Sequence, residues 1–135
     1  MRSTIVASSS TERPIVDRMG RHPRLGLCLD SCHLYASGYD ITDRGELDRL
    51  LEDVDARIGL DRLRCLHIND SKAPLGSNRD RHDGVLAGLM GERLGVFIGH
   101  PQLQGLPAVI ETGAVNRGPD ASDITALREL RARWL

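Results

Sequence analysis

Three short apolar runs of this sequence end in side chains that can bind a metal ion. The runs are residues 25–30 (LGLCLD), 63–68 (LRCLHI) and 108–111 (AVIE). Asp30, His67 and Glu111 lie at or near the carboxyl ends of these strand-length runs. Parallel α/β folds build their sites at the carboxyl ends of strands. The sequence therefore predicts that these three side chains share one site.

More candidate ligands lie in the segments that follow the first two runs. His33 comes three residues after Asp30, and Asp80 and His82 lie in a long loop after the second run. Imidazole together with carboxylate suits zinc, manganese or iron better than calcium or magnesium. Six ligands are too many for one tetrahedral ion, so they indicate at least two metal ions, a usual arrangement for phosphoester hydrolysis.

Each candidate taken alone also has a structural explanation. Asp30 can cap the turn after its strand, His67 can be a hydrogen-bonded core histidine, and residues 80–82 can form a solvated charged loop. The metal-site hypothesis is favoured because the structural explanation has to account for every position separately. His22 and His100 have no such neighbours, and we expect them to be structural.

The segments around the runs have helical patterns. Asp43 is a candidate N-cap and Gly59 a candidate C-terminal stop. The residues between them repeat at helical spacing: Leu47, Leu50, Leu51, Val54 and Ile58. A weaker helix is expected around Met90, Leu94, Phe97 and Ile98, a last helix from Ser122 to Trp134, and another over residues 12–19. Strands that alternate with helices predict βα units on a parallel sheet.

The composition sets limits on the kind of protein. The 135 residues fit one domain, and 40% hydrophobic with 27% charged residues is an ordinary globular mix. A net charge of −1 argues against a broad basic surface that would hold nucleic acid by neutralising phosphates alone. A nucleic-acid ligand would need local positive charge from a few loop arginines or from bound metal.

The cysteines and apolar runs indicate a cytoplasmic protein without a membrane anchor. Three cysteines show no disulfide pattern, and Cys28 and Cys65 lie within apolar runs, as buried thiols do. A reducing, cytoplasmic setting is therefore expected. None of the apolar runs approaches the length of a membrane span, and the first 14 residues do not form a signal peptide.

Four motifs contain the candidate ligands: residues 28–33 (CLDSCH), 66–72 (LHINDSK), 76–82 (GSNRDRH) and 110–112 (IET). Together they resemble the endonuclease IV family, the zinc-dependent nucleases that cut DNA beside abasic sites. Their order and spacing agree with the family from about Asp17 to Leu130. The resemblance implies a TIM (β/α)8 barrel that carries two to three zinc ions at its C-terminal mouth, with manganese as an alternative metal.

The same resemblance assigns roles to individual residues. His33, Asp80 and His82 would bind one zinc ion. Asp30, His67 and Glu111 would bind a second one and act in catalysis through it. The positively charged Lys72 and Arg81 would contact DNA. The implied reaction is hydrolysis of the phosphodiester 5′ to an abasic site in double-stranded DNA, as in base excision repair.

The sequence also departs from the family. The N-terminal half, with about four strands, two histidine ligands and a bridging glutamate, has no counterpart here. The loop after His82 runs DGVLAG over residues 83–88, where the family has a Gly-Glu-Gly turn. We therefore predict an α/β fold that is a partial barrel of about three to four C-terminal βα units. Residues 1–14 are expected to be a flexible tail and residues 15–135 the C-terminal half of the barrel.

Such a half barrel should pair with a missing N-terminal half or self-associate, because its open sheet edges invite pairing. Activity in isolation is not expected to match that of a complete enzyme. Two alternatives remain open at this stage. One is a non-catalytic metal-binding half domain that pairs with another chain. The other is a sugar-isomerase-like barrel enzyme, which would not need the loop at residues 80–82.

Overall fold

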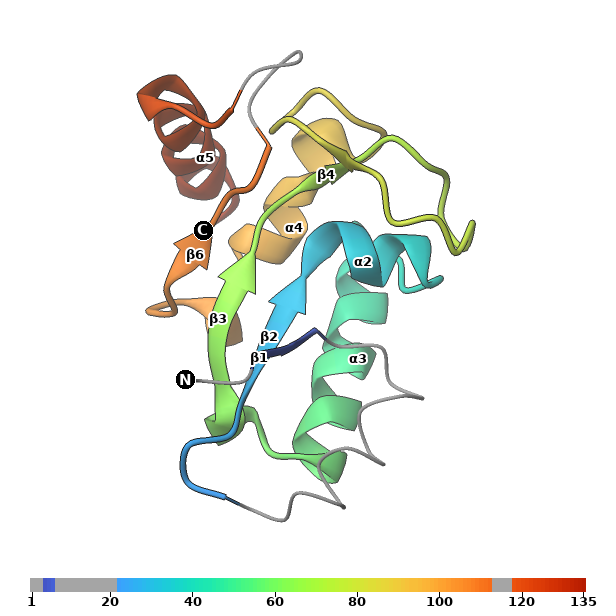
Figure 1. Cartoon of the computed structure of the whole chain (residues 1–135), viewed down its shortest axis with the longest axis vertical. Coiled ribbons are helices and arrows are strands. Elements are labelled where there is room, and N and C mark those ends of the chain that lie inside the picture. The colour runs from blue at the N-terminus through green and yellow to red at the C-terminus, as the bar shows by residue number, and fades with distance from the viewer. Residues whose placement is uncertain (1–3, 7–21, 113–117) are drawn as a thin grey trace.

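A parallel sheet with helices along it forms the framework of the protein. The computed structural model describes residues 4–6, 22–112 and 118–135. Over these residues the sheet has four strands in the order β1–β2–β3–β6, and every neighbouring pair is parallel (Figure 1). The strands are β1 Thr4–Val6, β2 Gly26–Asp30, β3 Leu63–His67 and β6 Ala108–Val109. The predicted βα architecture is therefore confirmed as an incomplete barrel.

Side chains of the two central strands, β2 and β3, point alternately to the two faces of the sheet, which separates the hydrophobic core from the candidate site. Leu27 and Leu29 of β2 are buried, and so is Leu66 of β3; all three belong to the main hydrophobic cluster. Neighbouring residues in a strand point to opposite faces. Asp30 and His67 therefore lie on the face turned away from that core, and the register pairs them directly.

Helix α3 (Arg44–Arg57) follows the sequence prediction closely. The Asp43 side chain accepts the Glu46 backbone N–H at 2.9 Å, which satisfies one free donor of the first turn. The helix ends before Gly59, whose φ of +100° is one that other residues adopt only under strain. Its inward stripe, which includes Leu47 and Leu51, is buried.

The two later helical segments match the prediction in place but differ in detail. The weaker pattern forms a 3₁₀ turn, η2 (Gly91–Leu94), that continues into the short helix α4 (Gly95–Ile98). The last helix, α5 (Ala121–Trp134), begins earlier than expected. Asp120 caps it in a reciprocal capping box, so the predicted Ser122 N-cap is wrong by two residues. Helix α4 packs between α3 and α5, and the three form one layer.

The long loop after β3 is an ordered hairpin. Strands β4 (Asp70–Ser71) and β5 (His82–Asp83) pair antiparallel. The turn between them is tied to the short helix α2 (Ser31–Ala36) by two backbone hydrogen bonds, from Gly76 N–H to Tyr35 O at 3.1 Å and from Asn78 N–H to Ala36 O at 2.9 Å. The hairpin therefore has a fixed position beside the end of β2. Two 3₁₀ turns, η1 (Leu60–Arg62) and η3 (Pro101–Leu103), complete the described elements.

The N-terminal segment corrects one expectation. Residues 1–14 were predicted to be a flexible tail, yet Thr4–Val6 form β1, which pairs with β2 in the register Thr4–Gly26 to Val6–Cys28. A short β-branched and apolar run completes a strand there because the edge of β2 offers backbone partners. The helix expected over 12–19 lies outside the described residues. In the described part of the chain, no helix is long and apolar enough to span a membrane.

Candidate functional site

The three strand-end residues predicted from the sequence meet at one point. His67 Nδ1 lies 3.5 Å from Asp30 Oδ2 and 3.5 Å from Glu111 Oε2. Asp30 and His67 close β2 and β3, whereas Glu111 lies two residues beyond the end of β6. Glu111 is therefore carried by the segment that follows its strand. The geometry provides two carboxylates around one imidazole at the carboxyl edge of the sheet.

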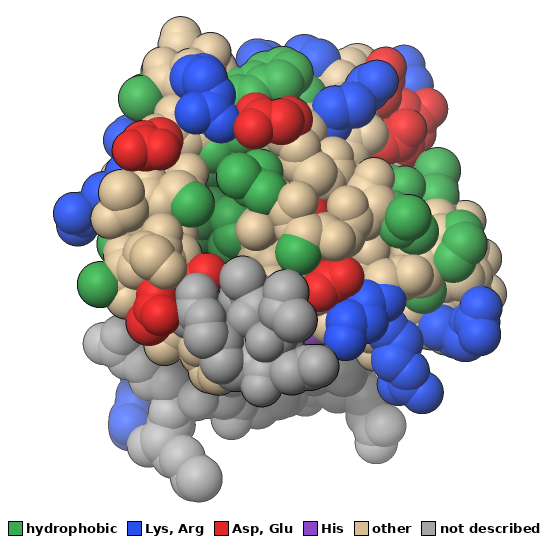
Figure 2. All heavy atoms as spheres, turned by 90° about the horizontal axis from the view of Figure 1, so that it is seen from above, with side chains coloured by type: hydrophobic (Ala, Val, Ile, Leu, Met, Phe, Trp, Pro, Cys, Tyr) green, Lys and Arg blue, Asp and Glu red, His purple; other side chains and the backbone are tan. Residues whose placement is uncertain are grey.

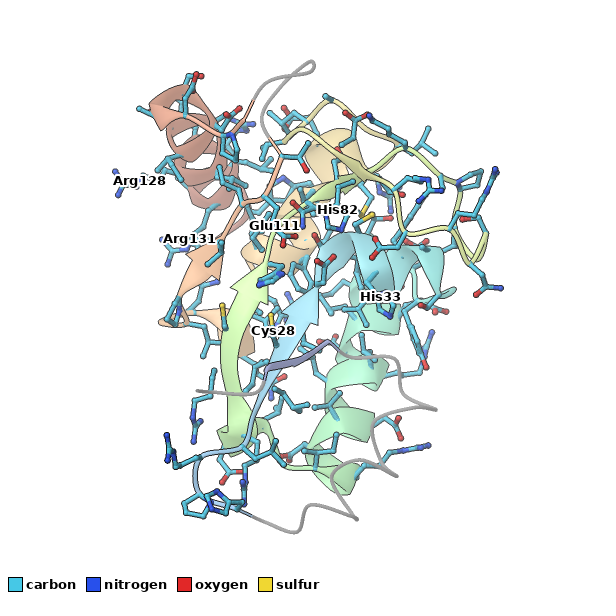
Figure 3. The ribbon with its side chains drawn as sticks, in the orientation of Figure 1. Cys28, His33, His82, Glu111, Arg128 and Arg131 are labelled. Atoms are coloured by element: carbon cyan, nitrogen blue, oxygen red, sulfur yellow. The ribbon has the colours of Figure 1, made fainter. Side chains whose placement is uncertain are left out.

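The hairpin delivers a second histidine to the same point. His82 Nε2 lies 3.1 Å from Asp80 Oδ1 and 3.7 Å from Asp30 Oδ2, and His82 Nδ1 lies 3.4 Å from Glu111 Oε2. His33, on α2, places Nδ1 3.6 Å from Asp80 Oδ2. Figure 3 shows His82 and Glu111 together above the strands, with His33 to one side. We name the six residues the carboxylate–histidine cluster: Asp30, His33, His67, Asp80, His82 and Glu111.

The grouping within this cluster differs from the two expected sets. Asp30, His82 and Glu111 can each offer a ligand atom within 4.8 Å of the others, and so can Cys32, Asp80 and His82. His82 thus belongs to both groups and joins them. Cys32, fully buried on α2, was not predicted as a candidate. Cys32 directly precedes His33 in the sequence. Only its position on the short helix α2 shows that its thiol lies close to Asp80 and His82.

Asn69 is a further site residue that sequence reasoning did not single out. Its Nδ2 donates to Asp30 Oδ2 at 3.3 Å and to Glu111 Oε2 at 2.8 Å, and its Oδ1 accepts the Glu111 N–H at 3.2 Å. Its backbone is held by Ser31, whose Oγ donates to Asn69 O and accepts from Asn69 N–H. This fully buried amide fixes the two carboxylates relative to each other.

Asp30 serves both as a structural cap and as a member of the cluster. Its Oδ1 accepts the His33 N–H at 2.9 Å and caps α2, while Oδ2 faces His67 and His82. Burial raises the pKa of Asp30 above its ordinary value, and the charges of Asp80 and Glu111 raise it further. The structural explanation, a helix cap, therefore holds for Asp30, and metal binding by this residue stays a prediction. A cation in the cluster would relieve the cost of keeping this carboxylate charged.

Asp70 lies next to Asn69 but has a structural role. It is fully buried, and its carboxylate accepts the backbone N–H groups of Met90 at 2.9 Å and Gly91 at 2.9 Å. Gly88 packs so closely against it that an added Cβ would lie 2.5 Å from Asp70 Oδ1. Asp70 thus fixes the loop that closes the base of the hairpin.

Positive charge lies at the rim of the site. Lys72 and Arg81 are both exposed, and Lys72 N–H donates to Arg81 O at 2.9 Å across the hairpin. Figure 2 looks onto the carboxyl ends of the strands and shows Lys and Arg side chains around the edge of this face, with Asp and Glu side chains among them. Arg81 directly precedes His82 of the cluster, and Lys72 is its hydrogen-bonded neighbour across the hairpin.

The two remaining histidines lie away from the cluster. His22 is exposed. His100 is buried, its Nδ1 accepts the Gln102 N–H at 3.1 Å, and its Nε2 donates to Asp48 Oδ1 at 2.8 Å. That hydrogen bond is the largest reason why the pKa of Asp48 is lowered. The structural role predicted for His22 and His100 agrees with this geometry.

We predict that His100→Ala destabilises the protein by about 2 kcal/mol without changing its affinity for zinc, because a buried hydrogen-bonded ring is lost far from the cluster. Urea unfolding and a zinc competition titration measure the two effects. His22→Ala is the matched control and should stay within about 0.5 kcal/mol. A loss of zinc affinity in His100→Ala would contradict the assignment.

The fold and the cluster at its strand ends define a class of protein. The chain belongs to the family described as the xylose isomerase-like TIM barrel, whose model it matches over residues 3–132. The nuclease resemblance seen in the motifs is confirmed more specifically by individual relatives. The protein named "Probable endonuclease 4" from Akkermansia muciniphila is 44% identical over 116 residues, which are 85% of this chain and 41% of that protein.

A second relative and a solved structure agree with this. The "Probable endonuclease 4" of Moorella thermoacetica is 39% identical over 119 residues, covering 87% of this chain and 43% of that protein. The crystal structure of endonuclease IV from Thermus thermophilus superposes with a TM-score of 0.68 at 33% identity, covering 89% of this chain and 42% of that one. The chain thus spans about two fifths of the length of these relatives.

Proposed function

We propose that this chain provides one side of the active site of a zinc-dependent abasic-site endonuclease. The substrate would be double-stranded DNA, and the reaction would be hydrolysis of the phosphodiester 5′ to an abasic site in base excision repair. The observation that carries this proposal is the convergence of His82, from the hairpin, with Asp30, His67 and Glu111 at the strand ends. The names of the similar proteins support the same reaction class.

The donor set supports zinc as the metal. Nitrogen and carboxylate oxygen atoms within one cluster suit zinc, with manganese as the alternative. Asp30, His67 and Glu111 would hold one ion, and His33, Asp80 and His82 would hold another, with His82 close enough to Asp30 and Glu111 to join the two sets. Bound zinc would act as a Lewis acid toward a phosphate oxygen.

The protein's own groups would orient the ligands and the substrate. Asn69 holds the Asp30 and Glu111 carboxylates in place through its amide, so that little reorganisation is needed when a cation binds. Lys72 and Arg81 would bind DNA phosphates, and their backbone pairing keeps the two charges on one ordered hairpin. Local charge of this kind offsets the acidic cluster in a protein whose net charge is −1.

The test is incision of an end-labelled duplex that carries a single abasic-site analogue. We expect the zinc-loaded chain to cut only the damaged strand, on the 5′ side, at a rate well below that of a full-length relative. Glu111→Gln and a chelator should each remove the incision. Zinc binding without incision at any protein concentration would favour a non-catalytic metal-binding domain instead.

We predict that Lys72→Ala and Arg81→Ala each weaken binding to any duplex and each reduce the slope of log affinity against log salt by about 1. The physical reason is the loss of one released counterion. Arg128→Ala is the matched control, because this exposed arginine on α5 points away from the cluster (Figure 3). An equal loss of DNA affinity in Arg128→Ala would show that Lys72 and Arg81 contribute no more to DNA binding than an arginine far from the cluster.

The open edge of the sheet supports a second polypeptide as partner. Val109 on β6 is 45% exposed, and β6 pairs with β3 alone among the described strands. An unpaired strand edge of this kind favours association with the missing half of a barrel or with a second copy. A sugar-isomerase-like activity is less well supported, because the similar proteins are named as endonucleases. A cytoplasmic location remains a prediction from the three free cysteines.

A further inference from the structure

Two thiols lie side by side directly below the carboxylate–histidine cluster. Cys28 of β2 and Cys65 of β3 are register partners, two residues before Asp30 and His67 on the same strands. One ligand atom each from Cys28, Cys65 and His67 lies within 4.8 Å of the other two. Figure 3 shows Cys28 below Glu111 and His82, on the strand that leads up to them. The nuclease proposed above makes no use of either thiol.

The spacing of the three ligand atoms suits a bridging ion. Cys28 and Cys65 are both free thiols, and one ligand atom of each lies within 4.8 Å of the other and of a His67 ring nitrogen. A tetrahedral ion with metal–sulfur bonds of about 2.3 Å holds its ligands roughly 3.8 Å apart, which is compatible with the observed grouping.

The environment selects the kind of ion. Cys28 is fully buried, while Cys65 is partly open and offers a path of entry. Two thiols and one imidazole form the donor set. Soft cations bind such donors strongly, and hard oxygen-seeking ions do not.

We propose that Cys28, Cys65 and His67 form a separate binding site for a thiophilic cation such as Cd²⁺. The site goes beyond the proposed nuclease function and does not depend on it. It shares His67 with the carboxylate–histidine cluster, so a cation held by the two thiols draws on a side chain that the zinc centre would also use. The two sites are thereby coupled through one imidazole.

The experiment is a cadmium titration of the whole chain kept reduced with a phosphine. The readouts are the ultraviolet charge-transfer absorption of cadmium–thiolate bonds and the metal count in a native mass spectrum. We expect Cys28→Ser and Cys65→Ser each to weaken cadmium binding by more than roughly a hundredfold. Groups that only orient a ligand already contribute about 10- to 100-fold. Circular dichroism of each variant without metal checks the fold.

Two controls separate this site from the zinc centre. Cys32→Ser removes the third thiol, which lies near Asp80 and His82, and should keep the absorption. The double variant Asp30→Asn with Glu111→Gln should keep it too, although it disables the zinc cluster. The proposal is overturned if the absorption survives in the Cys28→Ser, Cys65→Ser double variant. It is equally overturned if the absorption disappears in Cys32→Ser, or if the reduced chain takes up no cadmium.

Discussion

Asp30→Asn is expected to weaken zinc binding by more than about a hundredfold while keeping the N-cap of α2. The carboxylate faces both His67 and His82, so its loss would remove the anionic ligand proposed between them. Even groups that only orient a metal ligand contribute about 10- to 100-fold in affinity. Asparagine keeps the cap of α2, because its side-chain oxygen can still accept the His33 N–H.

The effect on stability has a defined dependence on pH. Burial raises the pKa of Asp30 in the folded protein above its ordinary value of 3.8. Ionisation of this group therefore disfavours the folded state, and the penalty is complete once the pH exceeds the raised pKa. It disappears as the pH falls below 3.8. The stability of Asp30→Asn relative to the parent should consequently rise from acid to neutral pH, because only the parent carries this ionisation penalty.

Asp43→Asn is the matched control for this prediction. Asp43 also caps a helix with its side chain, on the backbone N–H of Glu46, but it is exposed and far from the cluster. Thermal unfolding in the presence of a chelator and a zinc competition titration should both leave this variant close to the parent. If both asparagine variants bound zinc as the parent does, Asp30 would be a helix cap only.

Asn69→Ala is expected to weaken zinc binding by about 10- to 100-fold and to destabilise the protein by about 1–3 kcal/mol. The variant removes the amide that bridges Asp30 and Glu111 and leaves the Glu111 N–H without its acceptor. The carboxylates would then repel each other without a fixed donor between them. Asn69 would act as a positioning residue, since it contacts Asp30 and Glu111, the proposed ligands.

Isothermal titration with zinc and urea unfolding without metal measure the two effects of Asn69→Ala separately. Asn78→Gly is the control, because Asn78 is exposed in the hairpin and has a positive φ of 54° that glycine adopts freely. It should change neither quantity appreciably. A stability loss in Asn69→Ala with unchanged zinc affinity would mean that the amide supports the core and not the ligands.

Local signals in the sequence were sufficient to predict the elements whose limits depend only on residues close in the chain. Asp43 and Gly59 predicted the limits of α3 because capping and positive φ depend on neighbouring residues. The alternating strands predicted that Asp30 and His67 would reach the same edge, because the period of a strand is fixed. The last helix was misplaced at its start because Asp120 and Ser122 are both good caps, and the reciprocal bond with Asp123 decides between them.

Contacts distant in sequence were decided only by the tertiary structure. The β4–β5 hairpin brings His82 against Glu111, and two-residue strands carry too little pattern to predict such a pairing. The β-branched run Thr4–Val6 is too short to predict a strand, and it becomes one by pairing with β2. Asn69 gains its role from two carboxylates 39 and 42 residues away in the chain. The sequence by itself thus determined which side chains could bind a metal, and only the packed sheet and hairpin determined which of them meet, because long-range contacts depend on how the elements pack.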